Sequence, residues 1–471
     1  MRSHALKNPR PQGAARRLLS RLSSRFSPLL APLFPLLMSA CGGGGGGNDP
    51  TVPAASCSVA DQKAWLSSYM DDWYFWYRIS PRPAAAAYAS VDGYFSALLY
   101  TGSSADFPAD RWSRSESTES YNRFFGDGAT LGYGVSVAGV EVAGDASKPL
   151  YVRYVEPLSP AALQGVQRGD EILSLNGRSA ASVVGANDFS ALTAGQAGDT
   201  LTLELRRAGT LRTVVLRATV FKLSPVQGAA VITSPGGRRV GVLLVKDMIS
   251  QALAPADAAF AQFRAAGVQD LVLDLRYNGG GLVSTGATLA SYISGSRALG
   301  LSYAVLLYND KRAAANNQAY AFSNPAAALA LPRVYVLTGP RTCSASEQVI
   351  NGLRGAGLAV TTIGDTTCGK PVGFLPASSC GLTYSVVNFE SVNQRNEGRY
   401  FTGFPASCRV AEDFTAVQNG PSDPLRAAAL RLADGGVCAA MADDGRAGPL
   451  SLRRPGQRVL EPGERQDMVP R

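Results

Sequence analysis

The segment Leu271-Val-Leu-Asp-Leu-Arg-Tyr-Asn-Gly-Gly-Gly281 decides the fold of the larger part of this chain. Its first five residues, Leu271–Leu275, form a short apolar run that is typical of a buried strand. The polar and glycine residues after it indicate a loop, and the pattern from Leu282 to Ile293 predicts a helix. A strand, a glycine loop and a helix in this order are the repeating unit of a sheet covered by helices.

The same alternation continues on both sides of this segment. Further strands are predicted at Val240–Val245, Val334–Leu337 and Leu358–Ile363, and further helices at Ala256–Ala266 and Ser344–Leu353. We therefore expect an α/β core over residues 223–436, with a parallel or mixed sheet covered by helices. Ligands bind such sheets at the carboxyl ends of the strands.

Three polar loops follow predicted strands of this core. They are Asp274–Gly281, Thr342–Glu347 and Gly364–Lys370. Because the carboxyl ends of parallel strands meet at one edge of a sheet, we expect the three loops to lie together.

The sequence pattern of residues 128–222 is typical of a small β domain. Alternating strands are predicted at Leu201–Leu205 and Val214–Val220, and Asn176-Gly177 indicates a tight turn. The run Gly169–Gly177 resembles the GD-x-I-x-x-x-NG core of PDZ domains. The loop Leu131, Gly132, Tyr133 and Gly134 is similar to their carboxylate-binding loop, whose backbone N–H groups would hold a substrate's terminal carboxylate while a strand edge accepts the peptide. The simpler alternative is an ordinary β-rich domain with glycine turns.

The remaining ends of the chain complete a multidomain α+β fold. Residues 56–125 predict a small helical domain, whose first helix carries an aromatic stripe that we expect in the core: Trp65, Tyr69, Trp73 and then Trp76 or Tyr77. Pro81 and Pro83 end this helix, and a second helix is expected near Val91–Tyr100. The tail from 437 to 471 is rich in Arg, Gly and Pro, and we expect it to be disordered.

The charge pattern argues against a nucleic-acid partner. The 471 residues carry a formal charge of +9, from 45 basic and 36 acidic side chains. Seven of the basic residues and none of the acidic ones lie in residues 1–40, so the rest of the chain is nearly neutral. No basic face is implied, and a nucleic-acid partner is not expected.

Residues 1–40 are interpreted as a signal peptide. The apolar run Ser27–Ala40 is too short to cross a bilayer as a helix. Leu37–Cys41 resembles the lipobox of bacterial lipoproteins, which implies cleavage before Cys41 and a lipid anchor on its thiol; an ordinary secretory signal is the alternative. Residues 41–55 are a Gly-rich tether. Gly42, in place of an aspartate, favours the outer membrane, with the protein facing the periplasm.

The numbers of cysteine and histidine residues limit the disulfides, metal sites and catalytic groups that the chain can form. Without Cys41, six of the seven cysteines remain, an even number that fits three disulfides in an oxidising compartment. Fifteen connectivities are open; we favour Cys343–Cys368, Cys380–Cys408 and Cys57–Cys438. There is no CxxC spacing, so a zinc site is not expected. The single histidine is His4, which excludes imidazole-based triads from the mature chain.

The three core loops resemble the C-terminal processing (tail-specific) serine peptidases, whose DLR-x-N-x-GG, S-x-S-E and GK motifs follow a PDZ domain in the same order. The resemblance covers about residues 128–436, and the helical domain resembles that of a lipoprotein branch more loosely. It implies that Ser344 is the nucleophile and Lys370 the general base. The backbone N–H groups of Gly280 and Ala345 would then form the oxyanion hole, and no cofactor or metal is needed.

The residues themselves, without the resemblance, also allow a Ser-Lys pair to act as nucleophile and base. A lysine accepts a proton from serine only if desolvation or nearby positive charge lowers its pKa from about 10.4, and Pro371–Leu375 offers apolar surroundings. Two positions depart from the family. Phe374 stands where a lysine-orienting Gln is common, so either another group holds Lys370, with Glu347 or Gln348 as candidates, or activity is weakened. Gly279 stands where Pro is common.

Each motif alone also has a structural interpretation. Ser344-x-x-Glu347 fits a helix capping box, a lone Lys370 is ordinarily a surface lysine, and only the joint order favours catalysis. Gly364-x-x-x-x-Gly369-Lys370 resembles a nucleotide-binding loop, but Pro371 replaces the required hydroxyl and breaks the following helix.

The sequence therefore predicts a periplasm-facing serine endopeptidase whose PDZ-like domain presents protein or peptide substrates, for instance by their carboxyl ends. The chief alternative is a non-catalytic lipoprotein that binds peptides or apolar ligands on a peptidase fold, which Phe374 favours. A scaffold acting only through its PDZ-like domain is the third hypothesis.

Overall fold

The computed structural model describes residues 54–139, 141, 142, 144–438 and 464–470. The predicted signal peptide, Cys41 and most of the Gly-rich tether lie outside these residues, and the predictions about them stay predictions. Within the described ranges, no helix has both the length and the apolar character that a membrane span requires.

A six-stranded mixed sheet organises the core, as predicted. Its strand order is β10-β11-β12-β16-β17-β22; β10 is antiparallel to β11, and every other neighbouring pair is parallel. The strands are β10 (Val226–Thr233), β11 (Arg239–Val245), β12 (Asp270–Asp274), β16 (Arg333–Thr338), β17 (Ala359–Gly364) and β22 (Cys408–Arg409).

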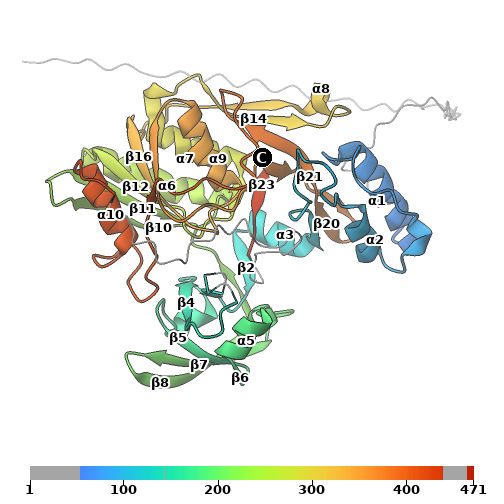
Figure 1. The fold of residues 1–471 in the computed structure, drawn as a ribbon, viewed down its shortest axis with the longest axis horizontal. Helices are drawn as coiled ribbons and strands as arrows, with labels where there is room; N and C mark the ends of the chain where they lie inside the picture. Colours follow the sequence, from blue (N-terminus) through green and yellow to red (C-terminus); the bar gives the residue numbers. More distant parts are fainter. Residues whose placement is uncertain (1–53, 140, 143, 439–463, 471) are drawn as a thin grey trace, which may run out of the picture. The chain divides into compact units, whose positions relative to one another are not determined.

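Helices cover both faces of this sheet (Figure 1). Side chains alternate along a strand, so Val272 of β12 packs in the cluster with α10, while Leu271 and Leu273 point to the opposite face with α6, α7 and α9. The core helices are α6 (Leu253–Ala265), α7 (Val283–Ser294), α8 (Ala313–Asn316), α9 (Ala345–Gly355) and α10 (Pro424–Ala433), with 3-10 turns η3 (Ser250–Ala252) and η4 (Gly295–Arg297).

A second sheet of the core has the order β15-β14-β21-β18. Its strands are β15 (Gln318–Ala321), β14 (Ser302–Tyr308), β21 (Val387–Val392) and β18 (Val372–Phe374). Next to it, the two-stranded pair β13 (Gly280–Leu282) and β23 (Asp467–Val469) joins the glycine loop to the end of the chain.

Strand β23 corrects one expectation. Disorder was expected from 437 onward, and for residues 464–470 this is wrong. The stretch is polar overall, but Met468 and Val469 are 0% and 1% exposed, and the strand pairs in parallel with β13. A short strand within an Arg-rich tail is stabilised here by tertiary contacts that composition does not reveal.

The amino-terminal region is helical and shares its core with the α/β region. Ser58 caps the first helix, which ends at Trp73, where Tyr74 turns to an extended conformation. The prediction that Pro81 and Pro83 end this helix is therefore wrong. Trp73, Tyr69 and Trp76 belong to the same buried cluster as Leu243 and Phe260, which confirms that the aromatic stripe is core. The elements are α1 (Val59–Trp73), η1 (Ala85–Ala87), α2 (Val91–Leu98), β1 (Arg114–Ser117) and α3 (Thr118–Phe125); β1 joins β20 (Leu382–Ser385) and β19 (Ala377–Ser379).

The β-rich region carries the ladder β3-β4-β5-β7-β8 around its own apolar cluster. Asn176 and Gly177 have φ of 48° and 78°, the backbone of the tight turn that the sequence predicts. Its elements are β2 (Ala129–Gly132), β3 (Val135–Val137), β4 (Leu150–Val155), α4 (Pro160–Leu163), β5 (Glu171–Leu175), β6 (Arg178–Ser179), α5 (Ala180–Ala186), η2 (Ser190–Leu192), β7 (Thr200–Arg207), β8 (Thr210–Arg217) and β9 (Thr219–Lys222).

Three disulfides close the fold. Cys343–Cys368 is present as predicted, but the other two predicted pairings are wrong. Cys57 bonds to Cys380 and Cys408 to Cys438, because β20 and its turn lie beside the start of α1 and Cys408 lies on β22, which packs under α10. Sequence spacing carried no information about these neighbours.

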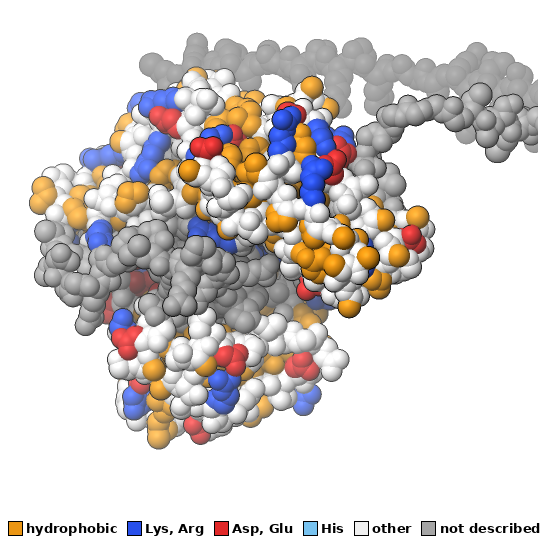
Figure 2. All heavy atoms as spheres, turned by 45° about the vertical axis from the view of Figure 1, so that its right-hand side comes forward, with side chains coloured by type: hydrophobic (Ala, Val, Ile, Leu, Met, Phe, Trp, Pro, Cys, Tyr) orange, Lys and Arg blue, Asp and Glu red, His pale blue; other side chains and the backbone are white. Residues whose placement is uncertain are grey.

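The surface charges are mixed on the face in Figure 2. Basic and acidic side chains lie next to one another there. Arg78–Asp310 and Lys311–Asp71 are ion pairs at the surface of the described chain. This face does not present the continuous basic field that nucleic-acid binding would need.

Candidate functional site

The three predicted loops meet at one edge of the six-stranded sheet. In the parallel register Asp274 pairs with Leu337, and Thr338 pairs with Gly364, so β12, β16 and β17 end side by side. Backbone bonds then link the loops directly: Cys343 N–H donates to the Asn278 carbonyl, and Cys368 N–H donates to the Thr342 carbonyl, both at 3.0 Å. The predicted convergence is confirmed.

Ser344 lies at the amino end of α9 in a strained conformation. Its φ is 61°, a left-handed value that costs a non-glycine residue about 1 kcal/mol or more. The side chain is fully buried, and among the described residues its Oγ has no hydrogen-bond partner. The Glu347 half of the predicted capping box is present, because its carboxylate accepts from the Ser344 N–H at 2.9 Å, but the Ser344 hydroxyl is not held by a hydrogen bond to the helix.

The Glu347 carboxylate joins the serine loop to the lysine loop. One oxygen, Oε2, accepts from the backbone N–H of Ser344 at 2.9 Å and of Lys370 at 2.8 Å. The other accepts from Gly369 N–H at 2.8 Å and from the Thr367 hydroxyl at 2.6 Å. Burial raises the pKa of Glu347, and these four donors oppose that rise. Glu347 therefore fixes the backbones of the serine and lysine loops, whereas the Lys370 amine bonds elsewhere.

Lys370 is completely buried. Burial lowers the pKa of its amine well below the usual range, the Asp467 carboxylate opposes this shift, and the Arg114 guanidinium adds to it. The amine lies 3.6 Å from the centroid of the Phe374 ring and donates to the Gln466 carbonyl at 2.5 Å. Phe374 thus packs against the amine at the position where the family commonly has Gln.

Gln348, the other candidate for holding Lys370, points elsewhere. Its Nε2 donates to the Ser391 hydroxyl at 2.6 Å and lies 3.7 Å from the Met468 sulfur. Neither Glu347 nor Gln348 therefore replaces the family's Gln as a side-chain partner of the amine.

The predicted oxyanion donors lie next to one another. A Cβ placed on Gly280 would stand 2.9 Å from the Ala345 nitrogen and would collide with the Asp467 carbonyl oxygen. Gly280 has φ of 105°, which favours glycine. Its N–H donates to Asn278 Oδ1 at 2.8 Å, so in this conformation that donor is already engaged and its role stays a prediction.

Asn278 is a positioning residue that sequence reasoning treated only as part of a motif. Its Nδ2 donates to the Val245 carbonyl at 2.9 Å, and its backbone carbonyl accepts from the Ser346 hydroxyl at 2.9 Å. It therefore ties the glycine loop to β11 and to the start of α9. The signal in the sequence is an Asn directly before the run Gly279–Gly281.

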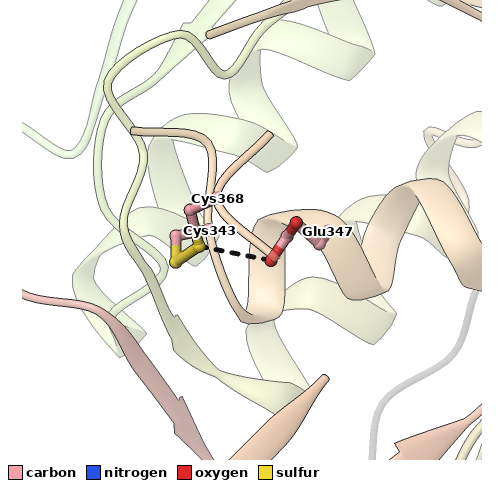
Figure 3. A group of neighbouring side chains, drawn as sticks. All are labelled: Cys343, Glu347 and Cys368. Carbon is pink, nitrogen blue, oxygen red and sulfur yellow. Dashed lines mark hydrogen bonds between the residues drawn. A yellow bond between two sulfur atoms is a disulfide. The ribbon is translucent and has the colours of Figure 1, made fainter. Parts of the chain in front are cut away.

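The disulfide Cys343–Cys368 lies beside Glu347, as Figure 3 shows. The two sulfurs and a carboxylate oxygen are within 4.8 Å of one another, which is a spacing found in metal sites. Sulfurs joined to each other are not thiolates and do not serve as metal ligands in this state. The 3.5 Å approach of the Cys368 sulfur to Glu347, dashed in Figure 3, is likewise a contact without a proton to share.

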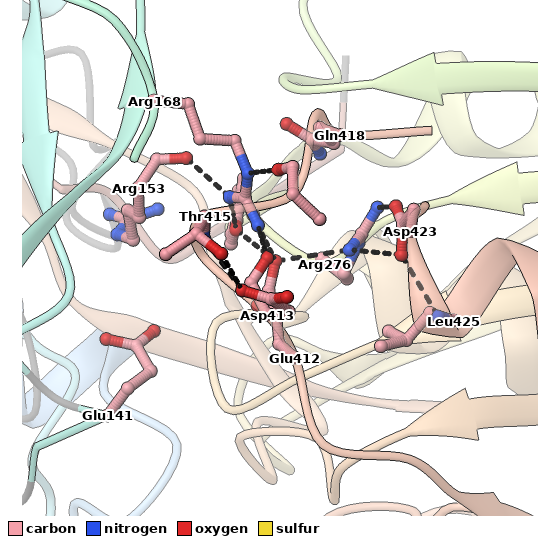
Figure 4. A network of polar contacts seen from close by, with 12 residues as sticks. Glu141, Arg153, Arg168, Arg276, Glu412, Asp413, Thr415, Gln418, Asp423 and Leu425 are labelled. Carbon is pink, nitrogen blue, oxygen red and sulfur yellow. Dashed lines mark hydrogen bonds and ion pairs between the residues drawn. The ribbon is translucent and has the colours of Figure 1, made fainter. Parts of the chain in front are cut away.

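A buried ionic network supports the first loop from the side of the β-rich region. Arg276 pairs with Asp274 at 2.8 Å, with Asp423 at 2.6 Å and with Glu412 at 3.1 Å, and Arg168 reaches the same Glu412 at 3.0 Å (Figure 4). Arg168 also donates to the Tyr277 hydroxyl at 2.5 Å. The arginine of the DLR motif therefore holds the loop through carboxylates rather than facing Ser344.

The predicted carboxylate-binding loop lines a cleft of about 730 Å³. Leu131, Gly132, Tyr133 and Gly134 share its walls with Gly279 and with Glu464, Arg465 and Gln466. Ser344 and Lys370 do not line it, because they are fully buried. The cleft thus leads from the β-rich region to the carboxyl-terminal segment that lies over the predicted dyad.

The segment 464–470 is the part of the site that sequence reasoning missed. The only local signal was the apolar pair Met468-Val469 within a polar tail, and a two-residue pattern is too short to indicate a strand.

Three regions of the chain match models of known families. Family models match residues 239–378 (peptidase family S41), 151–207 (PDZ domain) and 61–114 (peptidase S41 N-terminal domain). These matches confirm the predicted resemblance to this peptidase family over the matched residues and confirm the PDZ domain.

Two relatives of this chain are carboxyl-terminal-processing proteases. The chain is 27% identical to a carboxyl-terminal-processing protease of Picosynechococcus sp. over 240 residues, which are 50% of this chain and 55% of the relative. It is 28% identical to a carboxyl-terminal-processing protease of Synechocystis sp. over 289 residues, 60% and 64% of the two chains. The match thus spans less than two thirds of either relative.

A solved structure matches more completely. The crystal structure of a Bacteroides fragilis protein described as an S41 protease aligns with a TM-score of 0.60 and 25% identity, covering 79% of this chain and 97% of the other. The three-part architecture is therefore shared along nearly the whole length of that protein.

Proposed function

We propose that this protein is a serine endopeptidase of the C-terminal processing type, with Ser344 as the nucleophile and Lys370 as the general base. The single observation that carries the proposal is a buried hydroxyl at Ser344 without a hydrogen-bond partner among the described residues, on a loop joined by Glu347 to the loop of a buried lysine. A structural serine at this position would be bonded.

The reaction follows from these two groups. The neutral Lys370 amine takes the Ser344 proton as Oγ attacks the carbonyl carbon of the peptide bond. The C–N bond then breaks, the Lys370 ammonium gives its proton to the leaving amine, and a serine ester remains. A water molecule, deprotonated by Lys370, hydrolyses the ester and restores Ser344. The low pKa of the amine supports its role as a base near neutral pH.

Protein or peptide chains are the proposed substrates, and the PDZ domain is proposed to present them. The support is the cleft that runs from Leu131–Gly134 to Gly279. Peptides that add to a strand edge gain main-chain hydrogen bonds with little demand on sequence.

We further propose a lipid anchor at Cys41 and a location on the periplasmic side of the outer membrane. The pattern Leu37–Cys41 and the three disulfides of the described chain support this location. Labelling of cells with a fatty-acid probe tests the lipid anchor. The parent chain is expected to carry the label, and loss of the label in Cys41→Ala would show that the lipid is attached at Cys41. An unlabelled parent chain would contradict the anchor.

Covalent labelling with a fluorophosphonate tests the catalytic proposal. The parent chain is expected to be modified at Ser344, while Ser344→Ala and Lys370→Ala lose modification and casein cleavage by about a thousandfold or more. Ser182→Ala and Lys222→Ala, which change exposed residues, are the matched controls and should behave as the parent. A folded parent that is neither labelled nor active favours the alternative, a binding protein on a peptidase fold.

A further inference from the structure

The chain's own segment Glu464–Pro470 lies in the predicted site as a bound peptide strand. The Asp467 N–H donates to the Gly279 carbonyl at 3.0 Å, and Gly280, Gly281 and Leu282 pair in parallel with Asp467, Met468 and Val469. This is strand addition to the glycine-rich strand β13, the way in which extended peptides bind proteins.

The main chain of the segment touches the predicted catalytic groups. The Gln466 carbonyl accepts from the Lys370 amine at 2.5 Å. A Cβ built on Gly280 would collide with the Asp467 carbonyl oxygen and stand 2.9 Å from the Ala345 nitrogen, so both atoms lie close to Gly280. These are the positions that a substrate's backbone would occupy next to a base and an oxyanion site.

The two apolar side chains of the segment occupy opposite pockets. Met468 is fully buried in the main core cluster with Phe374, and its sulfur lies 3.7 Å from Gln348 Nε2. Val469 packs in a separate cluster with Phe124 and Leu282. Alternate residues of a strand point to opposite faces, so the groove contacts side chains on both faces of the strand.

Charged side chains hold the segment to three regions of the protein. Glu464 forms ion pairs with Arg153 of the PDZ domain and with Arg341 of the core. Asp467 pairs with Arg114 of β1, and Arg465 pairs with Glu116 of the same strand at 2.8 Å. The segment therefore complements the charges of the groove as well as its shape.

The position of the segment explains why the predicted dyad is closed to solvent. Ser344 and Lys370 are both 0% exposed, and the cleft beside the PDZ loop ends on Glu464, Arg465 and Gln466. A chain that enters this cleft meets the segment before it meets Ser344.

We propose that Glu464–Pro470 is a resident ligand of a strand-binding groove, and that substrates must displace it. The groove would take an extended peptide with an acidic side chain between Arg153 and Arg341 and an apolar side chain, four residues later, in the Met468 pocket. This inference rests on the proposed function for its consequence, which is restraint of turnover, but not for the binding itself. A tethered ligand competes at an effective concentration in the millimolar range, so modest affinity is enough to keep the groove filled.

Weakening the resident strand in the full chain tests the proposal. Met468→Asp places a charge in an apolar pocket and should release the strand, whereas Met468→Leu should retain it. Val417→Asp makes the same chemical change at a side chain that is 70% exposed and is the control. The rate at which a fluorophosphonate modifies Ser344 is expected to rise about fivefold or more in Met468→Asp and to match the parent in the other two.

A binding measurement separates this proposal from the catalytic one. A fluorescent peptide with the sequence of Glu464–Pro470 is titrated, by anisotropy, into Ser344→Ala chains with and without Met468→Asp. We expect at least about fivefold tighter binding to the Met468→Asp chain, and weaker binding of a peptide whose Met is replaced by Asp.

The outcomes are distinct. Tight peptide binding without any labelling of Ser344 supports the resident ligand and contradicts the peptidase. Labelling at the same rate in the parent and in Met468→Asp, or equal peptide binding to both chains, overturns the resident ligand and leaves the peptidase standing.

Discussion

The loops that carry Ser344 and Lys370 differ sharply from the strand that covers them, although all three meet at one sheet edge. The two loops are short continuations of β16 and β17 and are fixed by backbone bonds, by the Glu347 carboxylate and by a disulfide. The strand Asp467–Val469 is held by one short ladder, two apolar side chains and ion pairs.

The loops carry the groups that we propose to react, and the strand governs the access of a substrate to them. Groups that must keep a fixed geometry are built on the sheet, where burial and hydrogen bonds over-determine their positions. The covering strand has only three residues, Asp467–Val469, in its ladder with β13, and we expect it to open locally at a lower cost than the loops. Changes in the loops should therefore cost stability and activity together, while changes in the strand should leave stability nearly intact and raise activity.

The largest effect is expected from Glu347→Ala. It leaves the buried N–H groups of Ser344, Gly369 and Lys370 without their acceptor, which costs about 1–3 kcal/mol for each group. We expect the free energy of unfolding in urea to fall by about 3 kcal/mol or more, and the labelling of Ser344 to slow at least about tenfold. Glu204→Ala, at an exposed strand residue, is the control; equal losses in both variants would contradict the role given to Glu347.

Removal of disulfides tests whether the loops are rigid because of their own cross-link. Cys343–Cys368 and Cys408–Cys438 close loops of similar length, with separations of 25 and 30 residues. Chain entropy predicts a loss of about 3 kcal/mol for either pair of Cys→Ala changes. Only the loss of Cys343–Cys368 should also slow cleavage, because it holds the serine and lysine loops. If reduction of the protein left activity unchanged, this link would be unnecessary.

A smaller effect is expected from Phe374→Gln. Burial lowers the pKa of Lys370, and the aromatic ring forms one wall of its site. The base must be neutral to act, so activity falls as the pH drops through this pKa. An amide oxygen in place of the ring would stabilise the ammonium, raise the pKa and move the rising limb of the pH profile upward by about one unit. A limb that stays in place or moves downward would contradict the role of the ring.

The smallest effect is expected from Glu464→Ala in the covering strand. It removes the ion pairs to Arg153 and Arg341 and should speed labelling of Ser344 about two- to threefold. Arg341 keeps its ion pair with Glu141, and Arg153 keeps its hydrogen bond to the Val137 carbonyl, which limits the loss of stability. Unchanged labelling together with a large stability loss would place this strand among the structural elements.

Much of the fold and part of the site were predictable from sequence. Strands Val240–Val245 and Leu271–Leu275 were readable because buried parallel strands are continuous apolar runs, and Ser344 and Lys370 because their loops follow such strands. The pairings of Cys57 and Cys438 were not, since they depend on neighbours hundreds or tens of residues away. The role of Phe374 and the strand at Asp467–Val469 likewise arise only from tertiary packing.

The most direct test of the account is the pH dependence of Ser344 modification in the Met468→Asp chain, with modified residues located by mass spectrometry. We expect modification at Ser344 alone, with a rate that rises with pH well below the ordinary lysine pKa of about 10.4 and is lost in the same chain carrying Lys370→Ala. A folded chain that is unmodified at Ser344, or modified equally fast without Lys370, would contradict it.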